Sequence, residues 1–482
     1  MSAWQQVIGL EIHAQLQTRS KIFSPSPAAV CQMPNSQVRE TDGGMPGALP
    51  VLNFAVVECA VRFGIAIGAR VNPRSEFARK NYFYPDLPKG YQISQYEYPV
   101  VSGGEVIVEC DGEEKTIGIT RAHLEEDAGK LMHEGEGSVV DLNRAGTPLL
   151  EIVSEPQMFS PQEASAYAKT IRQLVRWLDI CDGNMQEGSF RIDANISMRR
   201  PGEKLGTRCE IKNLNSFRFL EAALVFEAQR QSAILEGGGE VRQQTLLYDP
   251  ARNETRMMRG KEDAEDYRYF PDPDLPPLVI GEAMINKMRE SLPKLPRERR
   301  RMFCEDYGLG GYDAGLLTSD RALADYFDSA VAGLIDENIG RRAAAKLAAN
   351  WILGELSSMM NKHNIGAKES PVSALSLAKL LRCVASGEIS GTIAKGVLET
   401  MWQNGEDADI IIKREGLRQI SDEGELQTLA ADIVAAHPAQ SAEYKSGKTK
   451  LLAFFVGQMM KQTNGKANPA RAADIIKKTL SE

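Results

Sequence analysis

The chain has 482 residues, of which 43% are hydrophobic and 25% are charged, and its formal net charge is −8. This length exceeds a typical single domain, so it predicts two or three domains with a large buried core. The negative charge argues against a surface covered throughout by nucleic acid, although it allows a local basic patch.

The sequence carries no signal for export, membrane insertion or disulfide formation. MSAWQQ, at residues 1 to 6, leads straight into the first predicted strand, and no basic stretch precedes an apolar run. No window holds the roughly 18 uninterrupted apolar residues of a membrane span. The seven cysteines are scattered and form no C-x-x-C pair. These features predict a cytoplasmic protein with free thiols that does not bind a membrane.

The first predicted strand is VIGLEIHAQLQ, residues 7–17, in which apolar residues from Ile8 to Leu16 alternate with polar ones. Glu11 and His13 therefore lie side by side on the face opposite the apolar residues. A carboxylate beside an imidazole holds a divalent cation or forms a simple hydrogen-bonded pair. These two residues alone favour the simple pair.

Basic and aromatic residues alternate in RKNYFYPDLPKGYQ, residues 79–92. Arg79, Lys80 and Lys89 stand among three tyrosines and a phenylalanine, a mixture that suits contacts with nucleotide phosphates and bases. The alternative is a loop packed by its own aromatic rings with solvated cations, and composition alone favours this alternative.

Acidic residues recur in several predicted strands. The run RAHLEEDAGK, residues 121–130, contains Glu125 and Glu126 after a histidine, and Glu151 interrupts the apolar run LLEIV, where a lone charge is costly. Asp193 lies on the polar face of a predicted strand over 189–200. Magnesium prefers such oxygen ligands, often completed by a phosphate. A shared Mg²⁺ site and separate surface acids are equally compatible with this pattern.

Further along the chain, helical patterns come to dominate. Ser160, Pro161 and Glu163 predict a helix start with a capping box, and a second helix is predicted over about 216–236. Four prolines in YRYFPDPDLPPL, residues 267–278, predict an extended segment that closes the first domain. From about 293 the pattern is helical, with a hinge expected at 402–409 and a small helical module over 411–482. The resulting prediction is three domains, 1–292, 293–408 and 409–482.

The C-terminal segment is basic although the whole chain is acidic. Residues 441–482 contain eight Lys and Arg against three Asp and Glu. SGKTK, residues 446–450, lacks the first glycine and the preceding strand of a phosphate-binding loop, so only its charge is informative. The candidate RNA contacts are Lys445, Lys448, Lys450, Lys461 and Lys466. The alternative is a solvated helical surface.

Several long strings together resemble the GatB family, the B subunits of the bacterial aspartyl/glutamyl-tRNA(Asn/Gln) amidotransferases. They are VIGLEIHAQL, FARKNYFYPDLPKGYQISQ, RAHLEEDAGK, DLNRAGTPLLEIVSEP, EGSFRIDANIS, EIKNLNSF, DYRYFPDPDLPPL and, in the tail, VGQMMKQTNGKANP. The resemblance implies an α+β fold: a mixed, largely antiparallel sheet forming a cradle domain, then an all-α helical domain and a small helical YqeY-like tail that binds tRNA.

The family reaction implied by this resemblance uses ATP and Mg²⁺. A mischarged Glu-tRNA(Gln) or Asp-tRNA(Asn) is phosphorylated on its side-chain carboxylate, and ammonia displaces the phosphate. The ammonia comes from GatA, a glutaminase, which with GatC completes a heterotrimer. The absence of a Gly-Gly-Ser-Ser amidase run is consistent with glutamine hydrolysis by another chain. Alternatives are a non-catalytic tRNA-binding scaffold and a stand-alone ligase that uses free ammonia.

The resemblance also assigns roles to individual residues. Glu11, His13, Glu126 and Glu151 are expected to hold the metal, and Glu11, Glu125, Glu126 and Asp193 to serve catalysis. Arg79, Lys80 and Lys89 are expected to contact ATP. Periodicity leaves Glu125 and Glu126 as alternatives because the apolar phase slips after Ile119, and the resemblance favours Glu126.

The chain departs from the family in one loop. Many members carry a zinc site there, formed by C-x-C followed by C-x-x-C. The matching positions in this sequence are Ser24, Ser26, Arg39 and Asp42, and Cys31 is the only cysteine nearby. We therefore expect no zinc, and a loop held by ordinary packing.

Overall fold

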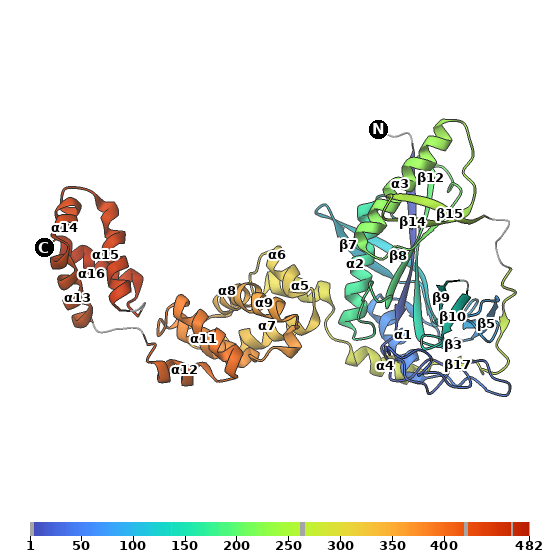
Figure 1. Ribbon diagram of the computed structural model, residues 1–482, viewed down its shortest axis with the longest axis horizontal. Coiled ribbons are helices and arrows are strands. Elements are labelled where there is room, and N and C mark those ends of the chain that lie inside the picture. Colours follow the sequence, from blue (N-terminus) through green and yellow to red (C-terminus); the bar gives the residue numbers. More distant parts are fainter. Residues whose placement is uncertain (1–3, 136, 261–265, 419–422, 464–465, 482) are drawn as a thin grey trace. The chain divides into compact units, whose positions relative to one another are not determined.

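The structure is a computed structural model that describes residues 4–135, 137–260, 266–418, 423–463 and 466–481. The chain forms two compact units, residues 1–295 and 296–482 (Figure 1). Within the described ranges, no helix combines the length and the apolar character that crossing a membrane requires. The division into three domains at 292 and 408 stays a prediction.

The first unit is built on one large sheet. Its strand order is β15-β14-β13-β12-β1-β11-β8-β6-β2, with β7 paired to β8, and of these pairs only β13–β14 is parallel. The strands are β1 (Gln5–Gln15), β2 (Arg70–Val71), β6 (Val101–Ser102), β7 (Glu105–Cys110), β8 (Glu113–Glu126), β11 (Pro148–Ser154), β12 (Phe190–Arg199), β13 (Cys209–Lys212), β14 (Gln244–Asp249) and β15 (Glu254–Gly260). The predicted mixed, largely antiparallel sheet is confirmed.

Three small sheets flank the large one. They pair β16 (Phe270–Pro271) with β4 (Ala78–Asn81) and β4 with β5 (Tyr91–Ser94), β17 (Leu278–Val279) with β3 (Arg74–Ser75), and β9 (Lys130–Glu134) with β10 (Gly137–Asp141). The predicted extended segment 267–278 is therefore confirmed, because it supplies β16 and the start of β17. It does not end the unit, since helix α4 (Glu282–Ser291) follows and contacts α1 (Phe54–Ala66).

Helices α2 (Pro161–Trp177) and α3 (Phe217–Glu236) lie along the large sheet (Figure 1). Both predicted helix starts are confirmed: the Ser160 and Ser216 hydroxyl oxygens accept backbone N–H bonds at the two N-caps. The predicted capping box is wrong in one detail. The Glu163 carboxylate accepts from the backbone N–H of Phe159 rather than from that of Ser160, and it also pairs with Lys115.

The two faces of the sheet differ, because α2 and α3 pack on one of them. On β1, Ile8, Leu10, Ile12 and Ala14 are completely buried in the core that these helices share. Glu11 and His13 belong to the opposite face, as the alternation predicts. This second face is polar and carries the candidate site.

The second unit is helical, as predicted. It begins with α5 (Pro296–Glu305), α6 (Gly311–Leu317), α7 (Arg321–Leu334), α8 (Arg341–Trp351), the π-helical turn η2 (Ile352–Leu356), α9 (Ser357–His363), η3 (Ala367–Glu369), α10 (Ala374–Ala385), α11 (Gly391–Asn404) and α12 (Ala408–Glu415). The hinge expected at 402–409 is wrong. That stretch ends α11 and begins α12, and α12 packs on α10 and α11. Asp407 fixes the turn by accepting bonds from Ser376 and Lys379.

The remaining helices form a small C-terminal helical module, but it begins at Glu423 rather than at the predicted 411, because α12 packs on α10 and α11. They are α13 (Glu423–Ala436), α14 (Pro438–Lys445), η4 (Thr449–Leu451), α15 (Leu452–Gln462) and α16 (Pro469–Ser481). Ten buried residues form a core of their own between α13, α15 and α16, and it includes Leu426, Phe455, Met459 and Ile476. The module therefore has the apolar interior of a separate folding element.

Candidate active site

A row of charged side chains crosses four neighbouring strands on the polar face. The strand register pairs Arg191 of β12 with His13 of β1, His13 with Glu151 of β11, and Glu151 with His123 of β8. The Glu151 carboxylate lies between two imidazoles: its Oε2 is 3.5 Å from His13 Nε2 and 3.3 Å from His123 Nε2. The row thus places one half-buried carboxylate between two rings.

Glu125 completes the group that we call the acid cluster, which consists of His13, Glu125 and Glu151. One ligand atom from each of the three lies within 4.8 Å of the others. Glu125 Oε1 is 3.7 Å from His13 Nε2, and the Glu125 residue is only 3% exposed. Three separate strands therefore bring two carboxylates and an imidazole together.

Glu126 is not part of the acid cluster, so the predicted preference for it as a metal ligand stays a prediction. A register irregularity beside Ile119 shifts the alternation of β8, and beyond it Ala122 and Leu124 face the core. Glu125 then falls on the polar face and Glu126 on the other. The Glu126 carboxylate pairs with Lys89 Nζ at 2.5 and 2.6 Å and accepts the backbone N–H of Ile93 at 2.8 Å.

The donor set of the acid cluster fits a divalent cation. Burial alone would lower the pKa of His13, but Glu151 and Glu125 raise it to about 9, so a proton on the ring compensates the carboxylates. Burial alone would raise the pKa of Glu151, but His123 and His13 hold it well below its ordinary value. A cation would take over the compensating role of that proton. The two carboxylates are the oxygen ligands that Mg²⁺ prefers.

Glu11 and Asp193 lie in the adjacent row rather than in the acid cluster. They are direct register partners, and the Glu11 carboxylate accepts a bond from the Asn195 amide at 2.9 Å. Burial, and then the negative charge of Glu151, raise the pKa of Glu11. Lys212 Nζ is 2.9 Å from both Asp193 and Glu210. Glu11 is thus near the acid cluster, whereas Asp193 already has a cationic partner.

The three cations predicted to contact ATP have different surroundings. Arg79 pairs with Asp272 at 3.0 Å and with Asp274 at 2.7 Å, so it ties β4 to the proline-rich segment. Lys89 neutralises Glu126. Lys80 is the exception: its Nζ lies 4.8 Å from the centre of the Tyr267 ring, and the described residues offer it no carboxylate within 4.0 Å.

Lys80 nevertheless lies within electrostatic reach of the acid cluster. Burial alone would lower the pKa of Lys80, but the negative charge of Glu125, with smaller contributions that include Glu151, raises it. A cation with a raised pKa, no close carboxylate among the described residues and an aromatic surround is suited to an incoming anion.

Two parts of the site are not predicted from the sequence. Lys212 and Glu210 stand on β13, where Cys209 and Ile211 are buried. The alternation in CEIK is the signal that could identify both residues, but four residues are too short a strand to be predicted with its register. Tyr269 is predicted only as part of an extended segment, and its position beside Lys80 depends on the pairing of β16 with β4.

The loop expected to lack zinc is held by a buried polar group instead of ordinary packing. Asp42 Oδ2 accepts bonds from the hydroxyls of Ser24 (3.0 Å) and Ser26 (2.5 Å) and from the backbone N–H of Arg39 (2.9 Å). Lys21 Nζ lies 3.5 Å from the same oxygen, and this lysine is completely buried. Burial lowers the pKa of Lys21, although Asp42 opposes that shift.

This arrangement predicts a stable loop without a metal. A zinc chelator is expected to leave the unfolding temperature of the protein unchanged. Asp42→Asn is expected to lower the free energy of unfolding by about 3 kcal/mol, because it leaves the Lys21 ammonium buried without its counter-ion. Calorimetry with and without chelator, together with metal analysis of the purified protein, checks both points. Stoichiometric zinc, or a chelator-dependent melting temperature, would contradict the prediction.

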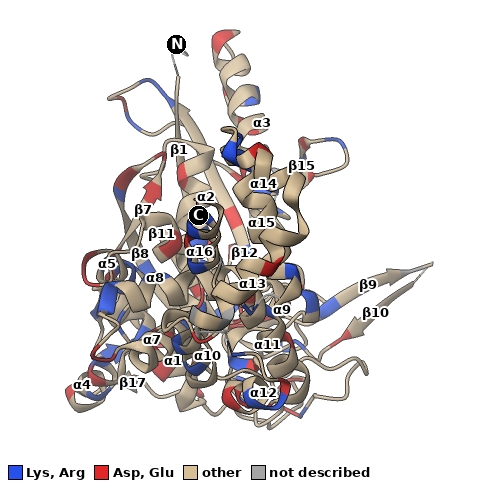
Figure 2. Ribbon diagram, turned by 90° about the vertical axis from the view of Figure 1, so that its left-hand side faces the viewer, with Lys and Arg blue, Asp and Glu red and all other residues tan. Residues whose placement is uncertain are grey.

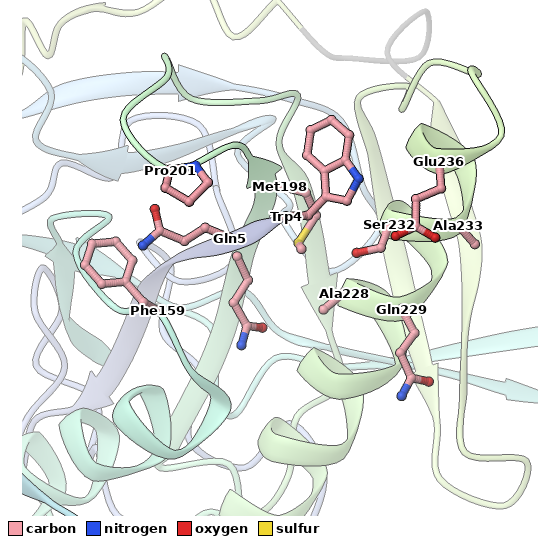
Figure 3. A pocket seen from close by; sticks show the side chains of 11 residues that line it. Trp4, Gln5, Phe159, Met198, Pro201, Ala228, Gln229, Ser232, Ala233 and Glu236 are labelled. Carbon is pink, nitrogen blue, oxygen red and sulfur yellow. The ribbon is translucent and has the colours of Figure 1, made fainter. Parts of the chain in front are cut away.

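A different hollow, of about 650 Å³, lies near the start of β1 and along α3 (Figure 3). Its walls include Trp4, Phe159 and Met198, together with the side chains of Gln5 and Gln229. Glu236 is the only titratable residue among the described residues that line it. It therefore lacks the groups that the acid cluster combines.

The predicted RNA-contacting lysines lie on the C-terminal module. Lys445, Lys448, Lys450 and Lys461 are exposed, and Lys466 is half-buried. Lys448 pairs with Glu443 at 3.1 Å. Figure 2 colours Lys and Arg blue and shows such residues on α16 as well. The five lysines lie on or next to α14, η4 and α15. They are spread over the surface and do not line one pocket.

Comparison with known proteins places these features in a family. Residues 6–286 match the family described as "GatB/GatE catalytic domain", and residues 333–480 match the "GatB domain". Relatives named as B subunits of aspartyl/glutamyl-tRNA(Asn/Gln) amidotransferase are 57% identical in Thioalkalivibrio sulfidiphilus, over 99% of both chains, and 56% identical in Nitrosococcus oceani, over 99% of this chain and 100% of the relative. A third, from Alkalilimnicola ehrlichii, is 55% identical over 99% of both chains.

Proposed function

The chain belongs to the GatB family, and we propose that it activates the side-chain carboxylate of Glu-tRNA(Gln), Asp-tRNA(Asn) or both for conversion to the amide. The observation that carries this proposal is the acid cluster, with Lys80 in its electrostatic reach, within the matched residues 6–286. The relatives are named as subunits, so we propose that the chain works in a heterotrimer with GatA, a glutaminase, and GatC.

The chemistry explains why the substrate carboxylate must be activated. A carboxylate is a poor electrophile because its negative charge is delocalised and it has no good leaving group. In the proposed reaction a carboxylate oxygen attacks the γ-phosphorus of ATP and ADP leaves. Ammonia then attacks the acyl carbon, inorganic phosphate leaves, and the amide remains on the tRNA.

The residues of this chain have distinct tasks in that sequence. Glu125 and Glu151, with His13, would hold a Mg²⁺ ion, which neutralises negative charge on a phosphoryl group in transfer. Lys80 is placed to attract the phosphates or the substrate carboxylate, because the described part of the chain gives it no close counter-ion. Glu11, two residues before His13 on β1, adds a further carboxyl group beside the cluster, and burial and then the negative charge of Glu151 raise its pKa.

A parallel assay tests this function. The complex reconstituted with GatA and GatC is given Glu-tRNA(Gln) or Asp-tRNA(Asn), and release of phosphate from ATP is followed with glutamine or ammonium chloride as the nitrogen source. Phosphate release that requires mischarged tRNA supports the proposal. Phosphate release that does not depend on tRNA, or no phosphate release at all, favours a non-catalytic scaffold. Full activity of the isolated chain with ammonium chloride favours a stand-alone ligase.

The C-terminal module is expected to contribute affinity for tRNA rather than chemistry. A deletion should remove 423–482 and spare α12, because α12 packs on α10 and α11. We expect weaker tRNA binding, a higher KM for mischarged tRNA and near-normal turnover at saturation. Each tRNA phosphate that the protein no longer neutralises lowers the log–log salt dependence of binding by roughly one unit.

Binding curves at several salt concentrations, for the full chain and the deletion variant, check this prediction. A matched variant replaces Lys445, Lys450 and Lys461 by Gln and keeps the helices. If its salt dependence equals that of the full chain, the lysines are a solvated surface and do not contact tRNA.

A further inference from the structure

A continuous row of aromatic rings passes Lys80, whose Nζ lies 4.8 Å from the centre of the Tyr267 ring. The rings of Tyr96 and Tyr269 are stacked, with centroids 4.4 Å apart and planes inclined by 9°. Tyr269 meets Tyr267 edge to face at 6.1 Å, and Tyr267 meets Tyr82 at 6.0 Å. Four tyrosines from three segments of the chain are thus in serial contact.

The position of this row is fixed by polar contacts. Arg79 holds Asp272 and Asp274, and the Asn81 side chain donates to the backbone carbonyls of Tyr267 and Arg268 at 3.1 and 2.9 Å. The segment that carries Tyr267 and Tyr269 is therefore clamped onto β4, the strand that also carries Lys80. This clamp gives Arg79 a positioning role, and its contact with ATP stays a prediction.

Tyr269 lines a pocket that lies near the acid cluster. Burial raises the pKa of Tyr269; the charge of Lys80 opposes the rise and that of Glu125 adds to it, so its hydroxyl lies within their electrostatic reach. Its ring lines a small pocket of about 130 Å³, together with Phe77, Tyr98 and Phe270. Ala78, which also lines the pocket, pairs in register with Ser94, and the Ser94 hydroxyl donates to the Glu125 carboxylate at 3.4 Å, so the pocket lies near the acid cluster.

Several aromatic side chains that line the pocket are exposed. Tyr96 is 49% exposed, Tyr98 is 53% and Phe270 is 44%. Adjoining exposed aromatic faces are typical of binding sites for flat ring systems, because each ring offers a stacking surface. Glu97 also lines the pocket, and its exposed carboxylate is an acceptor for an amino group.

Building on the proposed function, we propose that this pocket is an adenosine subsite in which the adenine stacks on the tyrosine pair Tyr96 and Tyr269. The group attached to the ribose then extends past Tyr269 toward Lys80 and the acid cluster. Two substrates of the proposed reaction carry adenosine. In ATP that group is the triphosphate, and at the 3′ end of tRNA it is the ester-linked amino acid.

A cationic side chain of a partner subunit is the competing occupant, since aromatic rings and carboxylates also attract lysine and arginine. The adenosine is favoured by the proximity of Lys80 to Tyr269. The proximity of Lys80 would not help the pocket to bind a cationic side chain of a partner. Glu76, the other acid of the pocket, already pairs with Arg74 at 3.0 Å, which leaves the pocket less negative than its composition suggests.

The test uses the complex reconstituted with its partner subunits and three variants of this chain. Tyr96→Leu removes the outer ring of the stack, Tyr96→Phe keeps it, and Phe54→Leu is a matched control at an aromatic residue of the same unit that is 51% exposed. KM values for ATP and for Glu-tRNA(Gln) are measured separately. The same proteins are titrated with ATP and with uncharged tRNA in equilibrium binding, which reports on the subsite even without turnover.

We expect Tyr96→Leu to raise one KM and the matching dissociation constant by about 5- to 100-fold, the usual loss for one base–aromatic stack. Tyr96→Phe and Phe54→Leu should stay within twofold of the unchanged chain. An effect on ATP places the nucleotide in the pocket, and an effect on tRNA places the acceptor end there.

Two results would overturn the subsite. One is a Tyr96→Leu variant in which both substrates bind as before. The other is a variant that loses affinity only for a partner subunit, which would assign the pocket to that partner. A wild-type complex without tRNA-dependent ATP turnover would count against the proposed function instead, and the equilibrium titrations would still decide the subsite.

Discussion

Glu125→Gln is expected to reduce tRNA-dependent phosphate release by at least about 10³-fold while the protein stays folded. Glu125 lies 3.7 Å from His13 and shares the acid cluster with Glu151, so its loss removes one of two carboxylates that would hold the cation. Glutamine keeps the volume and one acceptor oxygen but not the charge. The fold should tolerate the change, because it also relieves the repulsion between two neighbouring carboxylates.

A second measurement separates metal binding from catalysis. A ligand that binds only the folded state raises the unfolding temperature, so Mg²⁺ or Mn²⁺ should stabilise the unchanged protein and Glu113→Gln, a control at an exposed acid on the same strand. Glu125→Gln should lose that stabilisation. Retained cation-dependent stabilisation together with normal phosphate release would place the cation elsewhere.

Glu126→Gln, one residue further along β8, is expected to lower the free energy of unfolding by about 3 kcal/mol. Its side chain is 4% exposed and that of its partner Lys89 is 11% exposed, so the substitution leaves a nearly buried ammonium without a counter-ion. Glutamine can still accept the Ile93 N–H bond, so the charge is what is lost. Lys89→Met should cost a similar amount, because it leaves the Glu126 carboxylate unpaired.

The double variant Lys89→Met/Glu126→Gln provides the control. It removes both charges together, so it should be more stable than the sum of the two single changes predicts. Urea unfolding of the four proteins measures this coupling. If the effects are additive, the pairing of Glu126 with Lys89 is secondary. If Glu126→Gln leaves stability intact and instead removes the cation-dependent stabilisation, Glu126 belongs to the metal site, as the family resemblance implies.

Much of the architecture could be read from the sequence because local patterns dictate it. The alternation in β1 and β12 predicts their buried and polar faces correctly, since a strand directs successive side chains to opposite sides whatever it pairs with. The starts of α2 and α3 follow from Ser160 and Ser216, whose hydroxyls cap the free N–H groups of the first turn. The polar face of β1 likewise identifies Glu11 and His13 as candidates.

The surroundings of Glu125 and Glu126 depend on tertiary structure. The register irregularity beside Ile119 arises from how β8 pairs with β11, and such an irregularity reverses the faces of all residues beyond it. Ala122 and Leu124 hint at the new phase, but two residues before a run of acids are too few to establish it. The predicted hinge at 402–409 is wrong for a similar reason, because only packing shows that α12 belongs with α10 and α11.

The three cations near the site show most clearly what the sequence determined and what it left to the fold. Arg79, Lys80 and Lys89 share one basic, aromatic segment, and nothing local distinguishes them. Asp272 and Asp274 pair with Arg79 from nearly two hundred residues away, and Glu126 pairs with Lys89. Lys80 has no ion pair with a carboxylate among the described residues, and the negative charges of Glu125 and Glu151 reach it. The sequence by itself determined which chemical groups are present, and long-range strand pairing decided which of them neutralise one another, because electrostatic energy depends on distances that only the folded chain sets.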